Sequence, residues 1–151
     1  MEDAFRVTGK IHLLLTDEQG RVKDERKINN MVVNLGLAYI ASRMMGTAQA
    51  VMTHMAVGTG VTAETQTQTA LTTEVSRVAL TSSTIINTNV TGDSVQYVCV
   101  YLANVGISGA LSEAGIFNAA SAGIMLARKT FAVVNKANAD TLTATWVITA
   151  A

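Results

Sequence analysis

The sequence has no proline, a single cysteine and no long uninterrupted run of apolar residues. Without proline, no rigid hinge marks a domain boundary, and 151 residues fit one domain. The cysteine, Cys99, cannot form an internal disulfide, and its position in an alternating apolar run predicts a small buried hydrophobe. We therefore expect one domain over residues 1–151, with residues 1–30 as a possible N-terminal hairpin extension.

Charged residues are also scarce. They make up 15% of the chain, compared with roughly 25% in typical globular domains. Eleven basic side chains balance eleven acidic ones, so there is no excess positive charge to attract nucleic acid or an anionic membrane. We expect neither as a partner, and the low charge favours a protein whose faces are partly covered by neighbouring subunits.

Nothing in the sequence predicts insertion into a membrane. A membrane-spanning helix needs roughly 18 or more consecutive apolar residues, and no stretch approaches that length. The first four residues, Met-Glu-Asp-Ala, do not begin a basic and then apolar leader. We expect no recognisable export signal.

The N-terminal part alternates between apolar and polar residues, as a half-buried strand does. Phe5, Val7 and Ile11 belong to this pattern, which continues to Leu15. Turn residues 17–20 follow, and a charged run from 21 to 28 predicts a solvent-facing return strand. Residues 5–28 are therefore expected to form a β-hairpin.

The apolar spacing then changes to three and four, which predicts one short helix over about residues 35–45. Asn34 is placed to cap it and Gly46 to end it. The pair Met44-Met45 is interpreted as flexible packing in the core, with a cofactor contact as the alternative.

After Gly46 the chain becomes rich in Ala, Thr, Ser, Val and Gly, with short β-branched runs between turn residues. This composition is typical of an all-β protein, here an antiparallel β-sandwich or jelly roll. Residues 58–70 carry little apolar bulk and predict a long surface loop that could reach a neighbour. The expected strands lie near residues 52–57, 75–87, 94–102, 113–118, 123–134 and 140–149.

The residues that could carry catalysis or bind a metal are few. His12 and His54 are not spaced as a metal pair, and we interpret His54 as a hydrogen-bonded structural residue. Gly58-Thr59-Gly60 lacks the following Lys-Ser/Thr of a phosphate loop and opens no helix, so it is interpreted as a turn. We expect no catalytic residue, no cofactor, no metal and no small-molecule substrate.

Four residues are instead expected to be structural. Glu74 and Arg77 flank the start of a strand and can pair with each other or with the backbone of the next segment. Glu113 lies among small and apolar residues, where an unpaired carboxylate is costly, so it needs a partner such as Arg128 or Arg77. A catalytic role for Glu113 would need a second carboxylate at a suitable spacing. Trp146, in the last strand, should be buried.

Five stretches, none of them catalytic, form a pattern when they are taken together. They are residues 30–36 before the helix, 54–60 with Leu71, Glu74 and Arg77, residues 111–118, residues 131–136, and the Thr-rich strand that contains Trp146. Together these stretches resemble a family of small virion proteins of tailed bacteriophages, closest to the jelly-roll cement or decoration proteins of capsids.

The resemblance implies a protein that is made in the host cytoplasm, binds the outside of the major capsid protein shell and stabilises it. It also implies self-association into dimers or trimers. The hairpin 16–29, the loop 58–70 and the helix 35–45 are the candidate contact regions. The alternative is a tail-associated protein, such as a fibre, baseplate or adhesion module.

Overall fold

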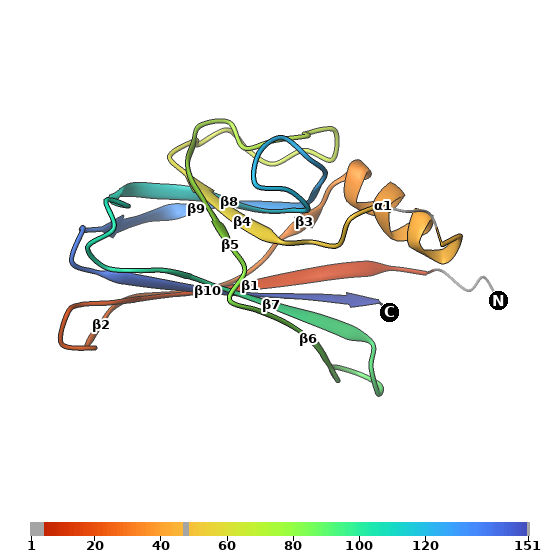
Figure 1. Cartoon of the computed structure of the whole chain (residues 1–151), viewed down its shortest axis with the longest axis horizontal. Helices are drawn as coiled ribbons and strands as arrows, with labels where there is room; N and C mark the ends of the chain where they lie inside the picture. The colour runs from red at the N-terminus through yellow and green to blue at the C-terminus, as the bar shows by residue number, and fades with distance from the viewer. Residues whose placement is uncertain (1–4, 47–48, 151) are drawn as a thin grey trace.

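The chain folds into two five-stranded antiparallel sheets that face each other, with one short helix at one end (Figure 1). These are features of a computed structural model that describes residues 5–46 and 49–150. The expected all-β sandwich is confirmed. The first four residues, on which the expectation of no export signal rests, lie outside the described residues. No helix among the described residues is long and apolar enough to cross a membrane.

The first sheet has the strand order β2-β1-β10-β7-β6, and the second has the order β3-β9-β8-β4-β5. The chain passes from one sheet to the other after β2, β5, β7 and β9. The first sheet contains β1 (Val7–Thr16), β2 (Val22–Asn29), β6 (Ser82–Ile86), β7 (Ser94–Tyr101) and β10 (Thr141–Ala150). The second contains β3 (Met31–Val32), β4 (His54–Gly58), β5 (Glu74–Ala79), β8 (Gly109–Phe117) and β9 (Met125–Lys136), and the helix is α1 (Asn34–Met44).

The N-terminal hairpin forms as expected from β1 and β2, but it does not extend from the domain. β1 lies between β2 and β10 and pairs with β10 over its whole length, from Val7 opposite Ala150 to Thr16 opposite Thr141. Ile11, whose partner in β10 is Trp146, is part of the buried core. Residues 7–29 are therefore built into the sandwich.

The run 75–87, expected as one strand, is two strands in different sheets. β5 pairs with β4 in the second sheet and β6 pairs with β7 in the first. The backbone changes its hydrogen-bonding partner between them. Leu80 N–H donates to Thr53 O, next to β4 of the second sheet, at 2.8 Å, and Thr81 N–H donates to Val98 O of β7 in the first sheet at 2.7 Å. No Gly or Pro marks this crossing, so the sequence alone did not separate the two strands.

The helix lies one residue earlier than expected, and its start differs. The N-cap is Val33 and has no side-chain capping bond, while Asn34 N–H donates to Gln66 O at 2.8 Å. Gly36 lets the helix lie close to β9, since a Cβ there would be 2.0 Å from Leu126 O. Gly46, with φ +67°, ends the helix as predicted.

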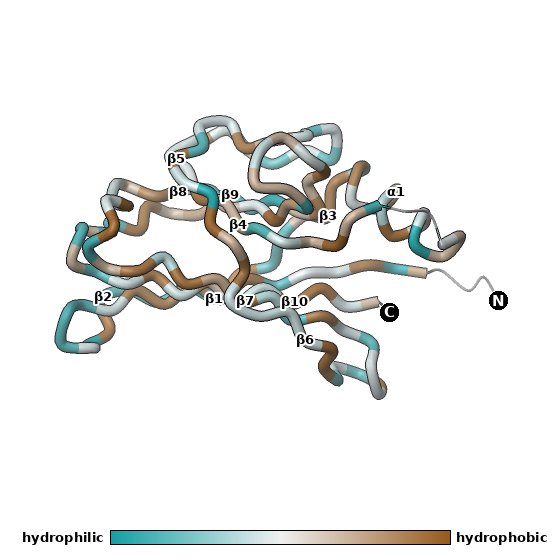
Figure 2. Tube along the Cα trace, in the orientation of Figure 1, coloured by the Kyte–Doolittle hydropathy of each residue, from teal (hydrophilic) through white to brown (hydrophobic). Residues whose placement is uncertain are grey.

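The core lies between the sheets and follows the period of two expected for strands. Buried positions alternate with less buried ones along most of β1 and β10, and in Figure 2 the strands of both sheets carry brown apolar segments between pale and teal ones. Trp146 is fully buried, as predicted, and its indole Nε1–H donates to Asn30 Oδ1 at 2.7 Å. Asn30 itself lies where the chain leaves β2 for β3, so this bond ties the crossing to the core.

Candidate contact site

Glu113 and Arg128 form a buried ion pair between β8 and β9, and neither side chain is exposed. Arg128 Nη2–H donates to Glu113 Oε2 at 2.7 Å and Nε–H donates to the same oxygen at 3.2 Å. The expectation that Glu113 has a charged partner is confirmed, and the partner is Arg128. Arg77 pairs elsewhere.

The Glu113 carboxylate also accepts three backbone hydrogen bonds from the segment that follows β4. The donors are the N–H groups of Gly60 at 3.1 Å, Thr72 at 3.0 Å and Thr73 at 2.7 Å. A Cβ at Gly60 would lie 2.4 Å from Glu113 Oε1, so glycine is needed for this close approach. The Gly58-Thr59-Gly60 motif therefore brings its backbone next to the Glu113 carboxylate of the same chain.

These bonds keep Glu113 ionised. Burial opposes the charged form, but the Thr73 N–H, the Arg128 guanidinium and the Thr72 N–H outweigh it and hold the pKa of Glu113 below its ordinary value. A carboxylate with five donors and a lowered pKa is a poor proton donor or general base at neutral pH. Its role in the fold is to hold the loop.

Glu64 fixes the same loop to β9 at a second point. Its carboxylate accepts hydrogen bonds from Lys129 Nζ, from the Thr130 hydroxyl and from Thr130 N–H. Burial opposes ionisation, yet the Lys129 and Thr130 bonds lower the pKa of Glu64 to about 2. The loop that could reach a neighbour is thus anchored along its length, although Val61 at its outer side is exposed.

Glu74 and Arg77 form the expected clamp. The Arg77 guanidinium donates to both Glu74 oxygens, at 2.9 and 2.7 Å, and to the backbone oxygens of Ala119 and Ala122. It also lies 3.7 Å from the ring centroid of Phe117. The pairing of Glu74 with Arg77 is confirmed. The backbone that Arg77 contacts belongs to the loop between β8 and β9, and not to the next segment of the chain as the alternative had it.

Three further titratable side chains, His54, His12 and Lys136, also make local hydrogen bonds. His54 Nδ1 shares a hydrogen bond with Thr53 Oγ1, and His12 Nε2 lies 2.8 Å from Glu25 Oε1. Lys136, a buried residue that the sequence analysis missed, donates to Ile107 O and Asp140 O at 2.8 and 2.7 Å. Within residues 5–46 and 49–150, no group of three or more His, Cys, Asp or Glu residues could hold a metal ion.

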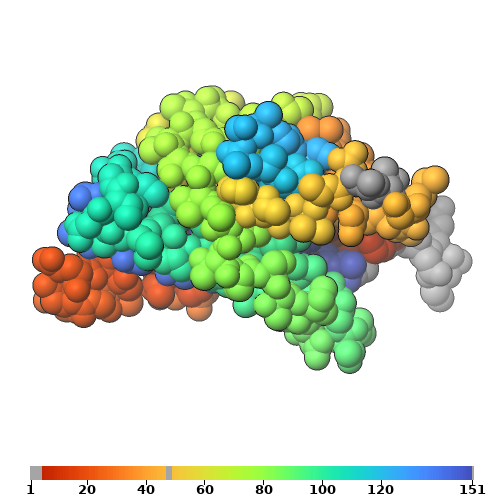
Figure 3. Space-filling model, in the orientation of Figure 1, coloured from red at the N-terminus to blue at the C-terminus, as the bar shows by residue number. Residues whose placement is uncertain are grey.

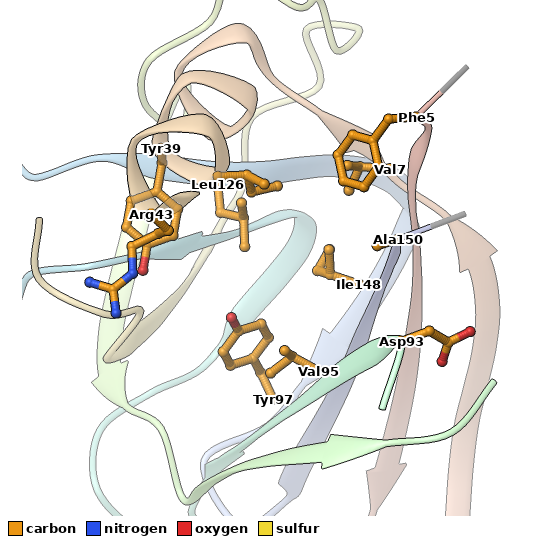
Figure 4. Close-up of a pocket in the computed structure, with 11 residues that line it drawn as sticks. Phe5, Val7, Tyr39, Arg43, Asp93, Val95, Tyr97, Leu126, Ile148 and Ala150 are labelled. Carbon is orange, nitrogen blue, oxygen red and sulfur yellow. The ribbon is translucent and has the colours of Figure 1, made fainter. Parts of the chain in front are cut away.

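The end of the sandwich next to α1 holds an apolar pocket of about 260 Å³. At this end α1 and β6 diverge in Figure 1, and Figure 3 shows the molecule hollowed between α1 and the β6–β7 segment. Side chains from α1, β1, β7, β9 and β10 face into the pocket (Figure 4). Its walls include Val7, Val95, Leu126 and Ile148.

A few polar groups lie in this pocket. Tyr39 of α1 and Tyr97 of β7 border it, and Arg43 and Asp93 lie on opposite sides of it in Figure 4. Burial, with a smaller contribution from Tyr39, raises the pKa of Tyr97 to about 12, so its phenol stays protonated and can donate a hydrogen bond. The Asp93 carboxylate accepts backbone N–H bonds from Thr88, Asn89 and Val90, which fixes the β6–β7 turn.

Three large apolar side chains at this end of the sandwich are exposed to solvent, and one of them, Phe5, also lines the pocket. Phe5 is 68% exposed, Met44 82% and Met45 87%. The interpretation of Met44-Met45 as core packing is therefore wrong, because the helix ends at Met44 and both side chains lie beyond the part of α1 that packs on β9. We call the pocket together with Phe5, Met44 and Met45 the α1-end surface.

Sequence reasoning did not find the α1-end surface as a unit, because the elements that form it are far apart in the chain. A usable signal was present at Met44-Met45, two adjacent methionines at a helix end that has no further turn to bury them. Comparison of the chain with models of known protein families, with curated proteins and with solved structures finds no match.

Proposed function

We propose that the chain is a structural protein of a tailed-bacteriophage particle, a cement or decoration protein that binds the outside of the major capsid protein shell and stabilises it. The observation that carries the contact function is the α1-end surface. The assignment to a capsid rests on the resemblance of the sequence stretches that include residues 54–60 and 111–118.

The α1-end surface has the properties of a protein-binding patch. Phe5, Met44 and Met45 together place large apolar side chains in water beside an apolar pocket, an arrangement that commonly marks an interaction site. Methionine and aromatic residues are enriched in interface cores, and flexible methionine side chains adapt to a partner's shape. An apolar segment of a shell subunit is the occupant that suits this surface.

The rest of the fold suits a rigid connector. The segment after β4 is held to β8 and β9 by Glu113 and Glu64, and the Arg77 clamp fixes the loop after β8. Anchored loops lose little conformational entropy when they are immobilised at an interface. A protein that reinforces a shell gains from such rigidity.

The number of copies per particle tests this proposal. Quantitative mass spectrometry of purified particles of the virus that encodes the chain should find copies on the same scale as the major capsid protein. Particles that lack the chain should break at a lower temperature and in milder osmotic shock than complete ones.

Two outcomes would contradict the proposal. A few copies up to about a dozen per particle would indicate a tail component, and absence from the particle would exclude a virion role. Equal resistance of particles with and without the chain would exclude cementing of the shell.

A further inference from the structure

The two sheets leave four edge strands, β2 and β6 in the first sheet and β3 and β5 in the second. An edge strand presents unpaired backbone N–H and C=O groups that can pair with another strand. Proteins usually protect such edges with charges, bulges or very short strands. The four edges of this sandwich differ sharply in that protection.

Three of the edges are protected. β2 carries an unbroken charged run from Lys23 to Lys27. β3 has only two residues, Met31 and Val32, and β9 beside it carries Arg128, Lys129 and Lys136, with Glu64 bonded to Lys129 Nζ and Thr130 N–H. β5 carries the paired charges Glu74 and Arg77, and its pairing with β4 shifts register between Val57 and Gly58.

The fourth edge, β6, has none of these protections. Its sequence is Ser-Ser-Thr-Ile-Ile, with no charge, no Pro and no Gly. It pairs with β7 without a register break, from Ser82 opposite Val98 to Ile86 opposite Ser94. Ser82 to Ile85 are exposed, Ile85 by 64%, and β6 is an outermost strand in Figure 1. This strand is open, regular and β-branched, which favours pairing.

We propose that β6 of one copy pairs in an antiparallel manner with β6 of a second copy about a twofold axis at Thr84. The first sheets of the two copies then join into one continuous sheet across the dimer. Antiparallel pairing of two identical strands is an isologous contact, because each residue meets its symmetry-related counterpart. Thr84 then lies opposite Thr84 of the second copy, and Ser83 lies opposite Ile85.

The charge pattern indicates a second copy as the occupant. Self-pairing of β6 brings no two like charges together. Self-pairing of β2 about Glu25 would place Glu25 against Glu25 and Lys23 against Lys27, and like charges directly opposite each other are destabilising. The formal net charge of zero adds no long-range repulsion between copies.

The pairing also covers apolar surface. Ile85 lies opposite Val95 of β7, which lines the pocket of the α1-end surface, so Ile85 continues the apolar lining toward the edge. Pairing with a second β6 places a neighbouring strand beside this exposed side chain. The dimer forms through backbone bonds of β6 and leaves Met44 and Met45 free for another partner.

Light scattering during size-exclusion chromatography tests the dimer. At about 100 μM, above the Kd of most specific contacts, the wild-type chain should have twice its 15.9 kDa mass. Ile85→Lys should be monomeric, because it puts a charge on the uncharged edge and places the two added ammonium groups diagonally across the paired strands, each opposite Ser83 of the other copy. The matched control is Val22→Lys, a change at an exposed β-branched residue of the β2 edge, and it should remain dimeric.

Cysteine cross-linking tests the register. Thr84→Cys should form a disulfide-linked dimer under mild oxidation, whereas Lys27→Cys on β2 should not. The native thiol, Cys99, is fully buried and does not interfere. Circular dichroism should show that every variant keeps the β-sheet signal of the wild type.

The proposal is overturned by a wild-type chain that is monomeric at about 100 μM. It is also overturned by a dimer that survives Ile85→Lys, or by cross-linking at Lys27→Cys in place of Thr84→Cys, since either result puts the interface on another surface. A folded Ile85→Lys monomer together with a Thr84→Cys cross-link supports it.

Discussion

At the scale of single residues, the buried pair of Glu113 and Arg128 explains several sequence features together. The sequence predicted that Glu113 needs a partner, because a lone carboxylate among small and apolar residues is costly. It did not predict the backbone N–H groups of Gly60, Thr72 and Thr73, since every residue except proline carries such a donor and only the fold aims it.

Replacing Glu113 should therefore destabilise the protein strongly. Glu113→Gln leaves the buried Arg128 charge without its counter-ion, and breaking a buried pair in this way costs about 3–5 kcal/mol of unfolding free energy. Glu25→Gln, which removes an exposed carboxylate paired with His12, should change it by less than about 1 kcal/mol. Urea denaturation of both variants measures the difference, and equal losses would show that the buried pair contributes little.

Trp146 gives a second prediction at this scale. Trp146→Ala should cost on the order of 3–5 kcal/mol, because it removes the largest fully buried side chain from the core. Trp146→Phe should cost less, but it leaves Asn30 Oδ1 without the indole donor. Thermal unfolding checks both, and a loss below about 1 kcal/mol for Trp146→Ala would contradict the burial of this strand in the isolated chain.

At the scale of elements, the loop after β4 should respond to acid. Glu64 and Glu113 both have a pKa below the ordinary glutamate value in the folded state, Glu64 about 2. Carboxylates of this kind contribute stability that is present above their unfolded pKa, about 4.5, and lost as the pH falls toward the folded value. The unfolding free energy should therefore decrease from about pH 5 to pH 2.

Denaturation curves over that pH range test the contribution of the loop anchor. Glu64→Gln should reduce the slope of unfolding free energy against pH, whereas Glu18→Gln, in the exposed β1–β2 turn, should keep the wild-type slope. Equal slopes in all three proteins would mean that the Lys129 and Thr130 bonds to Glu64 add no stability.

The elements themselves were predictable where the hydrophobic period is clear. The alternation in residues 5–15 and 140–149 predicted β1 and β10, and the helical spacing together with Gly46 predicted α1. The division of residues 75–87 into β5 and β6 was not predictable, because β-branched and small polar residues continue through the crossing at Leu80 and Thr81 without a Gly, Pro, Asn or Asp. β3 is too short to show any period.

At the scale of the whole molecule, the contact surfaces depend on how the sheets are arranged. The α1-end pocket forms because α1 and the end of the first sheet diverge, and residues from Phe5 to Ala150 meet there. The β6 edge exists because the chain changes sheets at Leu80 and Thr81. Neither feature is visible in a local stretch of sequence. The low charge of the chain, which favours contact between subunits, is visible in the sequence.

The proposed capsid function requires contact with other subunits, and it is tested most directly by binding of the purified chain to phage particles that lack it. Wild-type chain should bind such particles in saturable amounts, and Met45→Glu should bind at least about tenfold more weakly, because it places a charge on the α1-end surface. Val105→Glu, at an exposed position in the β7–β8 loop, should bind like the wild type. Absence of wild-type binding, or equal binding by all three proteins, would contradict this function.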